Sequence, residues 1–384
     1  MSIAFNISPG DFAEQYQEKK PLLIKSAVAK TYFPWQEANE VYNNSDAASE
    51  DLKLFLNGLI PKHEYIEKYL EIGTLRHRLA KPNVYEYLKN GATLIANKIK
   101  HSAKVDQLSR QIAVFTGRQV VSSAYVALGE KESSPCHWDT RDVFAIQLIG
   151  RKRWIIYEPS MESPIFTQQS KDYKDQHPCP SDPYMDIILE AGDILYIPRG
   201  WWHNPLPLGE PTFHLSVGTF PALAVDYLSW LFTHIENYAD SRKSLNSWRQ
   251  DSRTLASVGN HINELINNPE NYHRFIDEYT GATRIDSPLV LEFFGNPSAS
   301  ALPEHLGVRI CAICYPGLDS GYIIANGTRL NLDLKSLKIV QYIAESPGSS
   351  IMNLRDKLPE IPSSDLSTII TQLCRQDILE ILDY

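Results

Sequence analysis

The sequence predicts an α+β protein built around an antiparallel β-sandwich or small β-barrel, with helical segments before and after it. Three observations indicate this class. Short β-rich runs separated by turns occupy the middle of the chain, between residues 112 and 222. Mixed, partly helical sequence precedes them, and apolar positions at helical spacing follow from Leu223. Many short strands are typical of sandwiches and barrels, whereas the later periodicity is typical of helices.

The N-terminal part, residues 1–111, is predicted to be a mixed α/β region that supports the barrel. A short amphipathic helix opens at Asp11, and residues 21–25 have the composition of a strand. Residues 43–51 are polar and rich in turn formers, which predicts a surface loop. The apolar periods within residues 52–79 are compatible with helix.

The central part contains six runs with the composition of strands. A long polar connection over residues 159–186 interrupts them, and connections of that length are usually functional or mobile. The runs are residues 119–128, 143–148, 153–157, 187–189, 194–197 and 213–219.

The segment from Leu223 is predicted to be helical. Apolar residues surround nearly the whole first helix, which predicts burial on two sides, and two further helices follow over 255–266 and 272–279. These helices predict either a dimer interface or a layer packed on the barrel, and the residues alone favour neither.

The tail from about Pro288 is predicted to be a small separate domain. Apolar spacing indicates three helices, the third capped by Ser363 or Ser364, and residues 378–382 read as a closing strand. Three helices followed by a strand are typical of a winged helix. Because the third helix carries no basic cluster, DNA reading is disfavoured.

Composition limits the functional classes. The 384 residues are 43% apolar and 22% charged, with a net charge of −9, so two or three globular domains and no direct nucleic-acid binding are expected. The sequence contains no run of 18 apolar residues, so no membrane helix is expected, and the N-terminus lacks the pattern of a secretory signal. Five sparse cysteines favour reduced thiols and a cytoplasmic location.

Three residues in the central part have the types and spacing of a metal site. His137 and Asp139 are two apart, so on a strand they project to the same side. His203 follows two predicted tight turns, at Gly192 and at Pro198 to Gly200. Each piece alone is a weak signal, but in this order they predict the two-histidine, one-carboxylate triad of a non-haem Fe(II) oxygenase.

Lys152 is a candidate anchor for an acidic co-substrate. It lies between Arg151 and Arg153, which would face the other way on a strand. The alternative is three solvated basic residues at a turn, and the triad favours the anchor. The pair Cys311 and Cys314 has the spacing of a zinc or redox motif, but no second pair accompanies it and its apolar surroundings read as a strand.

With these motifs in place, the chain resembles the JmjC branch of the cupin superfamily, specifically the ribosomal oxygenase group. The motifs between Ser123 and Thr219 carry the resemblance, together with the N-terminal stretch 11–24, and the remainder matches in layout. The resemblance implies a double-stranded β-helix, or jelly roll. It also implies four parts: a supporting region (residues 1–111), the JmjC core (112–222), a helical dimerisation domain (223–287) and a winged-helix domain (288–384).

The resemblance also implies a role for each site residue. His137, Asp139 and His203 match the iron ligands of the family, and Lys152 matches the basic residue that binds the distal carboxylate of 2-oxoglutarate. Four further residues match positions that face this co-substrate, although Ser123 stands where the family has asparagine. These are Tyr125, Ser123, His214 and Ser216.

The activity implied is that of an Fe(II)- and 2-oxoglutarate-dependent dioxygenase that hydroxylates a protein or peptide side chain and produces succinate and CO2. The family precedents are arginine or histidine of ribosomal proteins, and the implied assembly is a homodimer. The alternative is a non-catalytic metal-binding cupin that acts as a dimeric protein-binding module. Histone-type demethylation fits the layout less well.

Overall fold

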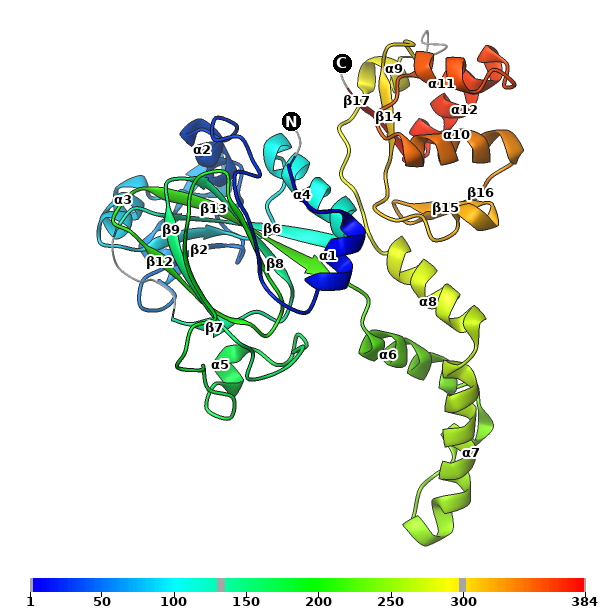
Figure 1. Ribbon diagram of the computed structural model, residues 1–384, viewed down its shortest axis with the longest axis horizontal. Coiled ribbons are helices and arrows are strands. Elements are labelled where there is room, and N and C mark those ends of the chain that lie inside the picture. Colours follow the sequence, from blue (N-terminus) through cyan, green and yellow to red (C-terminus); the bar gives the residue numbers. More distant parts are fainter. Residues whose placement is uncertain (1–2, 130–134, 297–301, 383–384) are drawn as a thin grey trace. The chain divides into compact units, whose positions relative to one another are not determined.

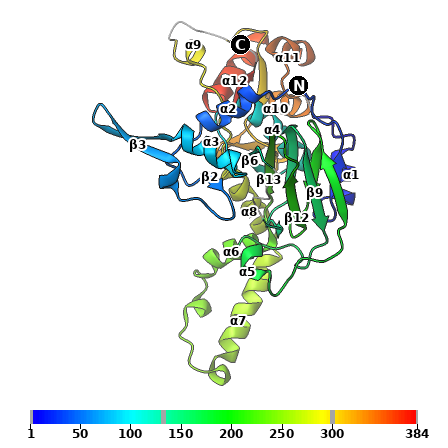
Figure 2. The same cartoon turned by 90° about the vertical axis from the view of Figure 1, so that its left-hand side faces the viewer.

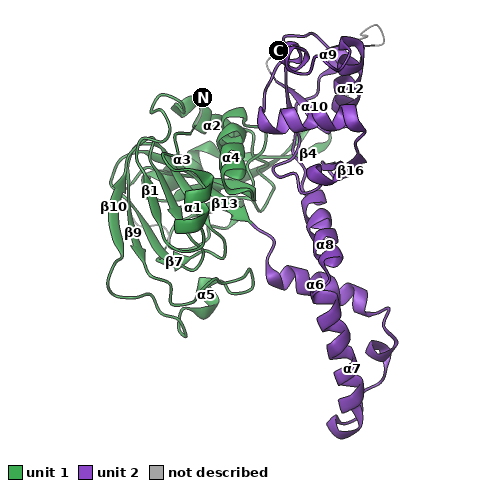
Figure 3. Cartoon of the chain, turned by 45° about the vertical axis from the view of Figure 1, so that its right-hand side comes forward, with its two compact units in different colours: residues 1–220 green, residues 221–384 purple. Residues whose placement is uncertain are grey.

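The computed structural model describes residues 3–129, 135–296 and 302–382. It forms two compact units, Met1–Phe220 and Pro221–Tyr384 (Figure 3). Each unit has its own buried apolar core. None of the helices in the described ranges is long and apolar enough to cross a membrane.

The first unit opens with helices and short strands. These elements are α1 (Pro9–Gln15), β1 (Leu22–Ile24), α2 (Trp35–Asn43), β2 (Leu52–Phe55), the 3-10 helix η1 (Lys62–Glu64), β3 (Ile66–Glu71), β4 (Thr74–Leu79), α3 (Lys81–Lys89), β5 (Thr93–Ala96) and α4 (Ala103–Thr116).

Eight strands and one short helix complete this unit (Figure 1). They are β6 (Gln119–Ala127), β7 (His137–Trp138), β8 (Val143–Ile149), β9 (Lys152–Tyr157), α5 (Ser170–Tyr173), β10 (Met185–Leu189), β11 (Ile194–Ile197), β12 (Trp202–Pro207) and β13 (Thr212–Phe220). Each of the six predicted strands is present, and β7 and β12 are additional strands that carry His137 and His203. Asp139, which was expected on the same strand as His137, lies just after β7.

Apart from the separate β3–β4 pair, the described strands of this unit form two antiparallel sheets. One sheet has seven strands in the order β1-β11-β8-β13-β6-β5-β2, and the other has four in the order β10-β9-β12-β7. Consecutive strands β8 and β9 belong to different sheets, so the chain crosses from one sheet to the other at Gly150. This arrangement confirms the predicted α+β class and the double-sheet barrel.

Alternation along each strand gives the large sheet two different faces. On β6, Ala124 and Val126 belong to the main apolar core, which also contains Leu108 and Ile112 of α4. Ser123 and Tyr125 therefore point to the opposite face, toward the interior of the barrel. The site is built on this second face.

The tight turn that Gly192 predicts is present before β11, and a buried carboxylate stabilises it. Asp193 accepts hydrogen bonds from Lys25 Nζ (2.5 Å) and from the backbone N–H groups of Ser26 and Glu190 (2.9 Å each). Gly192 has a φ of 100°, and a Cβ there would lie 2.3 Å from the carbonyl oxygen of Val28.

The prediction of helix for residues 52–79 is wrong. This segment forms β2 and the hairpin β3–β4, with only the short η1 between them. Ile72 and Gly73 both adopt positive φ (46° and 79°), which closes a two-residue hairpin turn. Because the hairpin exposes residues on both faces, the segment lacks the clean alternation that identifies a strand.

The second unit begins with the predicted helices. They are α6 (Ala224–Ile235), η2 (Ala239–Arg242), α7 (Trp248–Ile266), α8 (Pro269–Gly281) and α9 (Leu291–Phe294). The prediction that the first helix is buried on two sides is wrong for this chain by itself. Within α6 only Leu231 is buried, whereas Val225 and Phe232 are 41% and 53% exposed.

The tail combines three helices with short strands. These are β14 (Gly307–Ile310), η3 (Leu318–Ser320), β15 (Tyr322–Ala325), β16 (Thr328–Asn331), α10 (Leu334–Glu345), α11 (Ile351–Lys357), α12 (Ser363–Arg375) and β17 (Leu379–Leu382). The closing strand β17 pairs with β14, and β15 pairs with β16.

Two details of the tail differ from prediction. Neither Ser363 nor Ser364 caps α12, because the helix begins one residue after Pro362 and has no side-chain cap. The Cys311 and Cys314 segment is not a strand, because β14 ends at Ile310. Cys311 is buried and Cys314 is exposed, so the two thiols lie in different environments.

Candidate metal centre

The structure brings the three predicted ligands together. His137 on β7 pairs directly with His203 on β12, and their ring centroids are 4.4 Å apart. The Nε2 atom of His203 lies 3.7 Å from Oδ2 of Asp139. One ligand atom from each of the three residues lies within 4.8 Å of the other two.

Backbone carbonyl groups orient both imidazole rings. His137 Nδ1 lies 2.9 Å from the oxygen of Pro135, and His203 Nδ1 lies 3.1 Å from that of Trp201. Because a carbonyl oxygen only accepts, each Nδ1 carries the proton and each Nε2 presents its lone pair. Burial, followed by the charge of His137, lowers the pKa of His203 to about 4, so this ring is neutral, as a metal ligand must be.

The loop that carries Asp139 is anchored by the adjacent buried Asp142. The Asp142 carboxylate accepts hydrogen bonds from Tyr196 Oη (2.8 Å), Arg118 Nη1 (3.0 Å) and the N–H of Arg199 (3.0 Å). The N–H of Gly200 donates to the carbonyl oxygen of Asp139 (3.0 Å). The turn before His203 therefore also positions the loop of the carboxylate ligand.

Lys152 lies on β9 and is only 4% exposed. No described residue forms an ion pair or a hydrogen bond with its ammonium group, and burial lowers its pKa to about 8. The flanking Arg151 and Arg153 bind Glu210 and Asp186 at the surface. The prediction that they face away from Lys152 is therefore confirmed, and the alternative of three solvated basic residues is wrong.

Tyr125 and His214 lie on neighbouring strands in the barrel interior. They are cross-strand partners, and their rings stack with centroids 4.9 Å apart. Burial, followed by the positive charge of Lys152, lowers the pKa of His214 well below its ordinary value. Burial, followed by the charge of Asp139, raises the pKa of Tyr125 to about 12, so its hydroxyl keeps its proton. The charge of Lys152 therefore acts on one ring of this pair, and the charge of Asp139 acts on the other.

The two predicted serines form the next cross-strand pair on the same face. Ser123 of β6 lies opposite Ser216 of β13, and both are half-buried. A serine is shorter than the asparagine of the family pattern, so Ser123 leaves more space at this position.

Trp154 is a site residue that the sequence reasoning missed. Its ring centroid lies 6.1 Å from that of His203 and 5.6 Å from that of His214. The indole Nε1 is buried and has no hydrogen-bond partner among the described residues, as is also true of His214 Nδ1. The signal was present in the sequence, because Trp154 is two residues after Lys152 and so shares its face of the strand.

The interior of the barrel fits a metal ion with an anionic chelator. Two imidazoles and one carboxylate form the donor set that suits Fe(II) in non-haem oxygenases. Buried ammonium and indole donors without protein partners are costly unless a ligand satisfies them. All these groups lie between the two sheets, where β9 and β12 run side by side (Figure 2).

Comparison with known proteins agrees with this geometry. The family model for the JmjC domain matches residues 94–227. A bifunctional lysine-specific demethylase and histidyl-hydroxylase NO66 from Drosophila persimilis is 32% identical over 145 residues, which cover 37% of this chain and 20% of that protein. Ribosomal oxygenase 1 from Danio rerio is 26% identical over 211 residues, which cover 53% of this chain and 37% of that protein. The chain therefore spans well under half the length of these curated relatives.

Solved structures share the fold over the whole chain. The ribosomal oxygenase YcfD from Escherichia coli superposes with a TM-score of 0.62 at 18% identity, with 100% of both chains covered. A structure of YcfD in complex with cobalt and 2-oxoglutarate superposes with a TM-score of 0.59 at 17% identity, covering 100% of this chain and 99% of that one. The JmjC match, the His-Asp-His centre and the barrel agree: residues 94–227 match the JmjC domain, and the chain is similar to the ribosomal oxygenases.

Proposed function

We propose that the protein is an Fe(II)- and 2-oxoglutarate-dependent dioxygenase that hydroxylates a side chain of a protein or peptide. The observation that carries the proposal is the combination of two features in one barrel. The barrel contains a His-Asp-His centre and a buried lysine that has no partner among the described residues. The first feature fits a metal, and the second fits an acidic co-substrate.

The chain would divide the work among a few residues. His137, Asp139 and His203 would hold Fe(II), which supplies the activation of oxygen when bound. Lys152 would donate a charge-assisted hydrogen bond to the distal carboxylate of 2-oxoglutarate. Tyr125 keeps its phenolic proton and Trp154 its N–H, so both are donors for the same anion. Ser123, His214 and Ser216 would line the rest of this pocket.

The substrate that we propose is a side chain of a ribosomal protein. Support comes from the relatives, which are named histidyl-hydroxylase and ribosomal oxygenase. Histidine and arginine are the side chains we propose for hydroxylation. The cysteines are sparse and odd in number, five in 384 residues, which supports our proposal of a cytoplasmic location.

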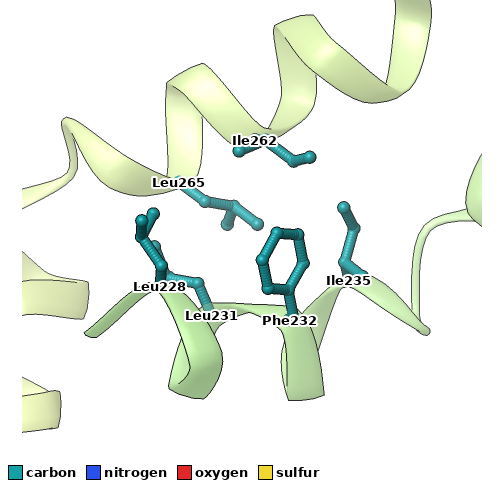
Figure 4. A pocket seen from close by; sticks show the side chains of 6 residues that line it. All are labelled: Leu228, Leu231, Phe232, Ile235, Ile262 and Leu265. Atoms are coloured by element: carbon teal, nitrogen blue, oxygen red, sulfur yellow. The ribbon is translucent and has the colours of Figure 1, made fainter. Parts of the chain in front are cut away.

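We also propose that the helices of residues 223–287 form a homodimer. Side chains of α6 and α7 form an apolar groove (Figure 4). Phe232 is 53% exposed and Leu228 is 37% exposed, although both belong to this groove. A second copy of the chain would cover these side chains. The groove is lined by Leu228, Leu231, Phe232, Ile235, Ile262 and Leu265.

We propose that residues 288–384 are a winged-helix-like domain. This part of the chain has an apolar core of its own, three helices (α10, α11 and α12) and the β14–β17 strand pair, which support the proposal. The boundaries at 111/112, 222/223 and 287/288 are part of the same proposal.

The decisive experiment is 2-oxoglutarate turnover to succinate with Fe(II), ascorbate and O2. Turnover by the wild type that is lost in His137→Ala and in Lys152→Ala supports a dioxygenase, and mass spectrometry of ribosomal proteins then tests the substrate through a gain of 16 Da. Absent turnover, together with absent 2-oxoglutarate binding to Co(II)-loaded protein, would support the alternative of a metal-binding protein module.

A further inference from the structure

Two cysteines that are far apart in the sequence meet beside the metal centre. The Sγ atoms of Cys136 and Cys179 are 3.5 Å apart, and both residues are half-buried. Cys136 directly precedes the ligand His137, and Cys179 lies in the long connection between β9 and β10. We propose that these thiols form a reversible disulfide that restrains the strand carrying His137.

A redox role fits this pair better than a metal site. Within the described residues, no third histidine, cysteine or carboxylate joins the two thiols in a cluster, whereas His137, Asp139 and His203 do form one. Structural zinc sites use four such ligands. Two adjacent thiols outside such a cluster can be oxidised together, with the loss of two electrons, to a disulfide.

The geometry requires little movement. A disulfide bond is about 2.05 Å long, so the sulfur atoms must approach by about 1.5 Å, which side-chain rotation can supply. Both residues are also partly exposed to solvent, as reaction with a small oxidant requires. Cys311 and Cys314 differ in this respect, because Cys311 is buried.

The connection that carries Cys179 is already attached to the ligand strands. The indole N–H of Trp138 donates to the carbonyl oxygen of Gln168 (3.0 Å), and that of Trp202 donates to Ser160 Oγ (2.9 Å). Ser160 in turn binds His177, two residues before Cys179. The disulfide would therefore add a covalent link where hydrogen bonds already hold the connection against β7 and β12.

The restraint acts directly on the metal centre. Strand β7 consists only of His137 and Trp138, and its partner is β12, which carries His203. A bond at Cys136 joins the residue before His137 to a point 43 positions further along the chain. Movement of His137 away from the centre would then require movement of that whole connection.

The oxidant is a peroxide. One thiol attacks the O–O bond and becomes a sulfenic acid while one water leaves. The second sulfur then forms the S–S bond and displaces the second water. Both S–H bonds and the O–O bond break, and two electrons pass from the sulfur atoms to the peroxide. A dithiol reductant reverses the reaction.

The test begins with the full chain, metal-free and reduced, treated with one equivalent of hydrogen peroxide. Peptide mapping without reduction is expected to show a peptide that links Cys136 to Cys179 within one chain, 2 Da lighter than the sum of its parts. The melting temperature is expected to rise by about 5 °C. Release of subsequently bound Co(II) to a chelator is expected to slow several-fold, and dithiothreitol should reverse each change.

The control variants separate this pair from other thiols. Cys179→Ser should abolish all three changes, whereas Cys314→Ser, which removes an exposed thiol in the second unit, should retain them. A sulfinic acid at Cys136, or a link to another cysteine, overturns the disulfide. A disulfide that leaves Co(II) release unchanged overturns the restraint. None of these outcomes depends on oxygenase turnover, so they are independent of the proposed function.

Discussion

Lys152 is the residue whose burial and charge conflict most directly. An ammonium group in an apolar interior is unfavourable unless an anion compensates it. No described residue provides that anion, and the lowered pKa of Lys152 records the cost. The structure therefore keeps an unfavourable charge at the place where a carboxylate of the proposed co-substrate would neutralise it.

Replacing Lys152 by methionine should weaken 2-oxoglutarate binding and leave metal binding intact. The loss of one charge-assisted hydrogen bond corresponds to about a 10- to 100-fold rise in Kd. Calorimetry on Co(II)-loaded protein measures both affinities. The matched control is Lys152→Arg, which keeps the charge and should retain most of the affinity. An unchanged Kd in Lys152→Met would refute the anchor role.

The same lysine predicts a pH dependence of binding. Its pKa in the free protein is about 8, so the ammonium form that binds the carboxylate disappears as the pH rises above that value. The Kd for 2-oxoglutarate should therefore increase about 30-fold between pH 7 and 9.5. The Lys152→Arg variant should bind almost equally across this range, because arginine remains charged. A rise of the same size in that variant would assign the effect to another group.

As the pH rises, Lys152 should weaken 2-oxoglutarate binding but increase the free energy of unfolding of the metal-free protein. Lys152 binds its proton more weakly in the folded state, with a pKa of about 8, than in the unfolded state, where the value is 10.5. Between these two values the unfolded state holds more protons, so this residue makes the folded state more stable as the pH rises. Lys152→Met would lack this contribution. Urea unfolding of the wild type and of Lys152→Met at pH 7.5 and 9.5 should therefore show a larger gain in the free energy of unfolding for the wild type.

At the scale of elements, the corner between β8 and β9 determines which side chains enter the barrel. Gly150 has a φ of 67°, and a Cβ there would lie 2.1 Å from the carbonyl oxygen of Pro211. The close approach brings the chain from one sheet to the other within two residues. Because strands alternate with a period of two, the corner sets Lys152 and Trp154 inward and Arg153 outward.

Gly150→Ala should therefore destabilise the fold by about 2 to 4 kcal/mol, since both the backbone conformation and the space oppose a side chain. The matched control is Gly117→Ala. Gly117 also has a positive φ of 64°, but a Cβ there meets no atom within 4 Å. The control should lose about 1 kcal/mol. Urea unfolding measures both variants, and equal losses would mean that the close contact with Pro211 is unimportant.

At the scale of the whole molecule, the exposed groove of α6 and α7 predicts self-association. Phe232→Asp together with Leu228→Asp should convert the proposed dimer into a monomer, because an aspartate in a covered apolar interface is strongly unfavourable. Light scattering at micromolar concentration measures the change. Ser229→Asp, at an exposed position of the same helix, should remain dimeric. A monomeric wild type would contradict the proposed homodimer.

The same groove shows that the sequence alone does not predict which surfaces are covered. The apolar circumference of α6 predicts a covered surface, and the prediction of burial on two sides assumes a partner within the chain. In the structure only Leu231 is buried within α6. Residues 52–79 gave a similar error, because an exposed hairpin has no buried face and therefore no alternation that marks it as β.

The sequence by itself determined the features that depend on local spacing. Composition identified six strands of the barrel, and the turn residues Gly192 and Gly200 marked the ends of β11, the strand that precedes His203. Strand β12, which carries His203, was not predicted. The spacing of His137 and Asp139 identified the ligand pair, but the expectation that one strand carries both is wrong, because β7 ends at Trp138 and Asp139 lies in the loop that follows.

Only the tertiary structure decided which distant groups meet and which have no partner. It placed Cys136 against Cys179, left Lys152 and the Trp154 indole without partners among the described residues, and exposed Phe232. The physical reason is that burial and pairing depend on contacts between segments tens of residues apart. The period of a single strand or helix carries no information about which segment will lie against it.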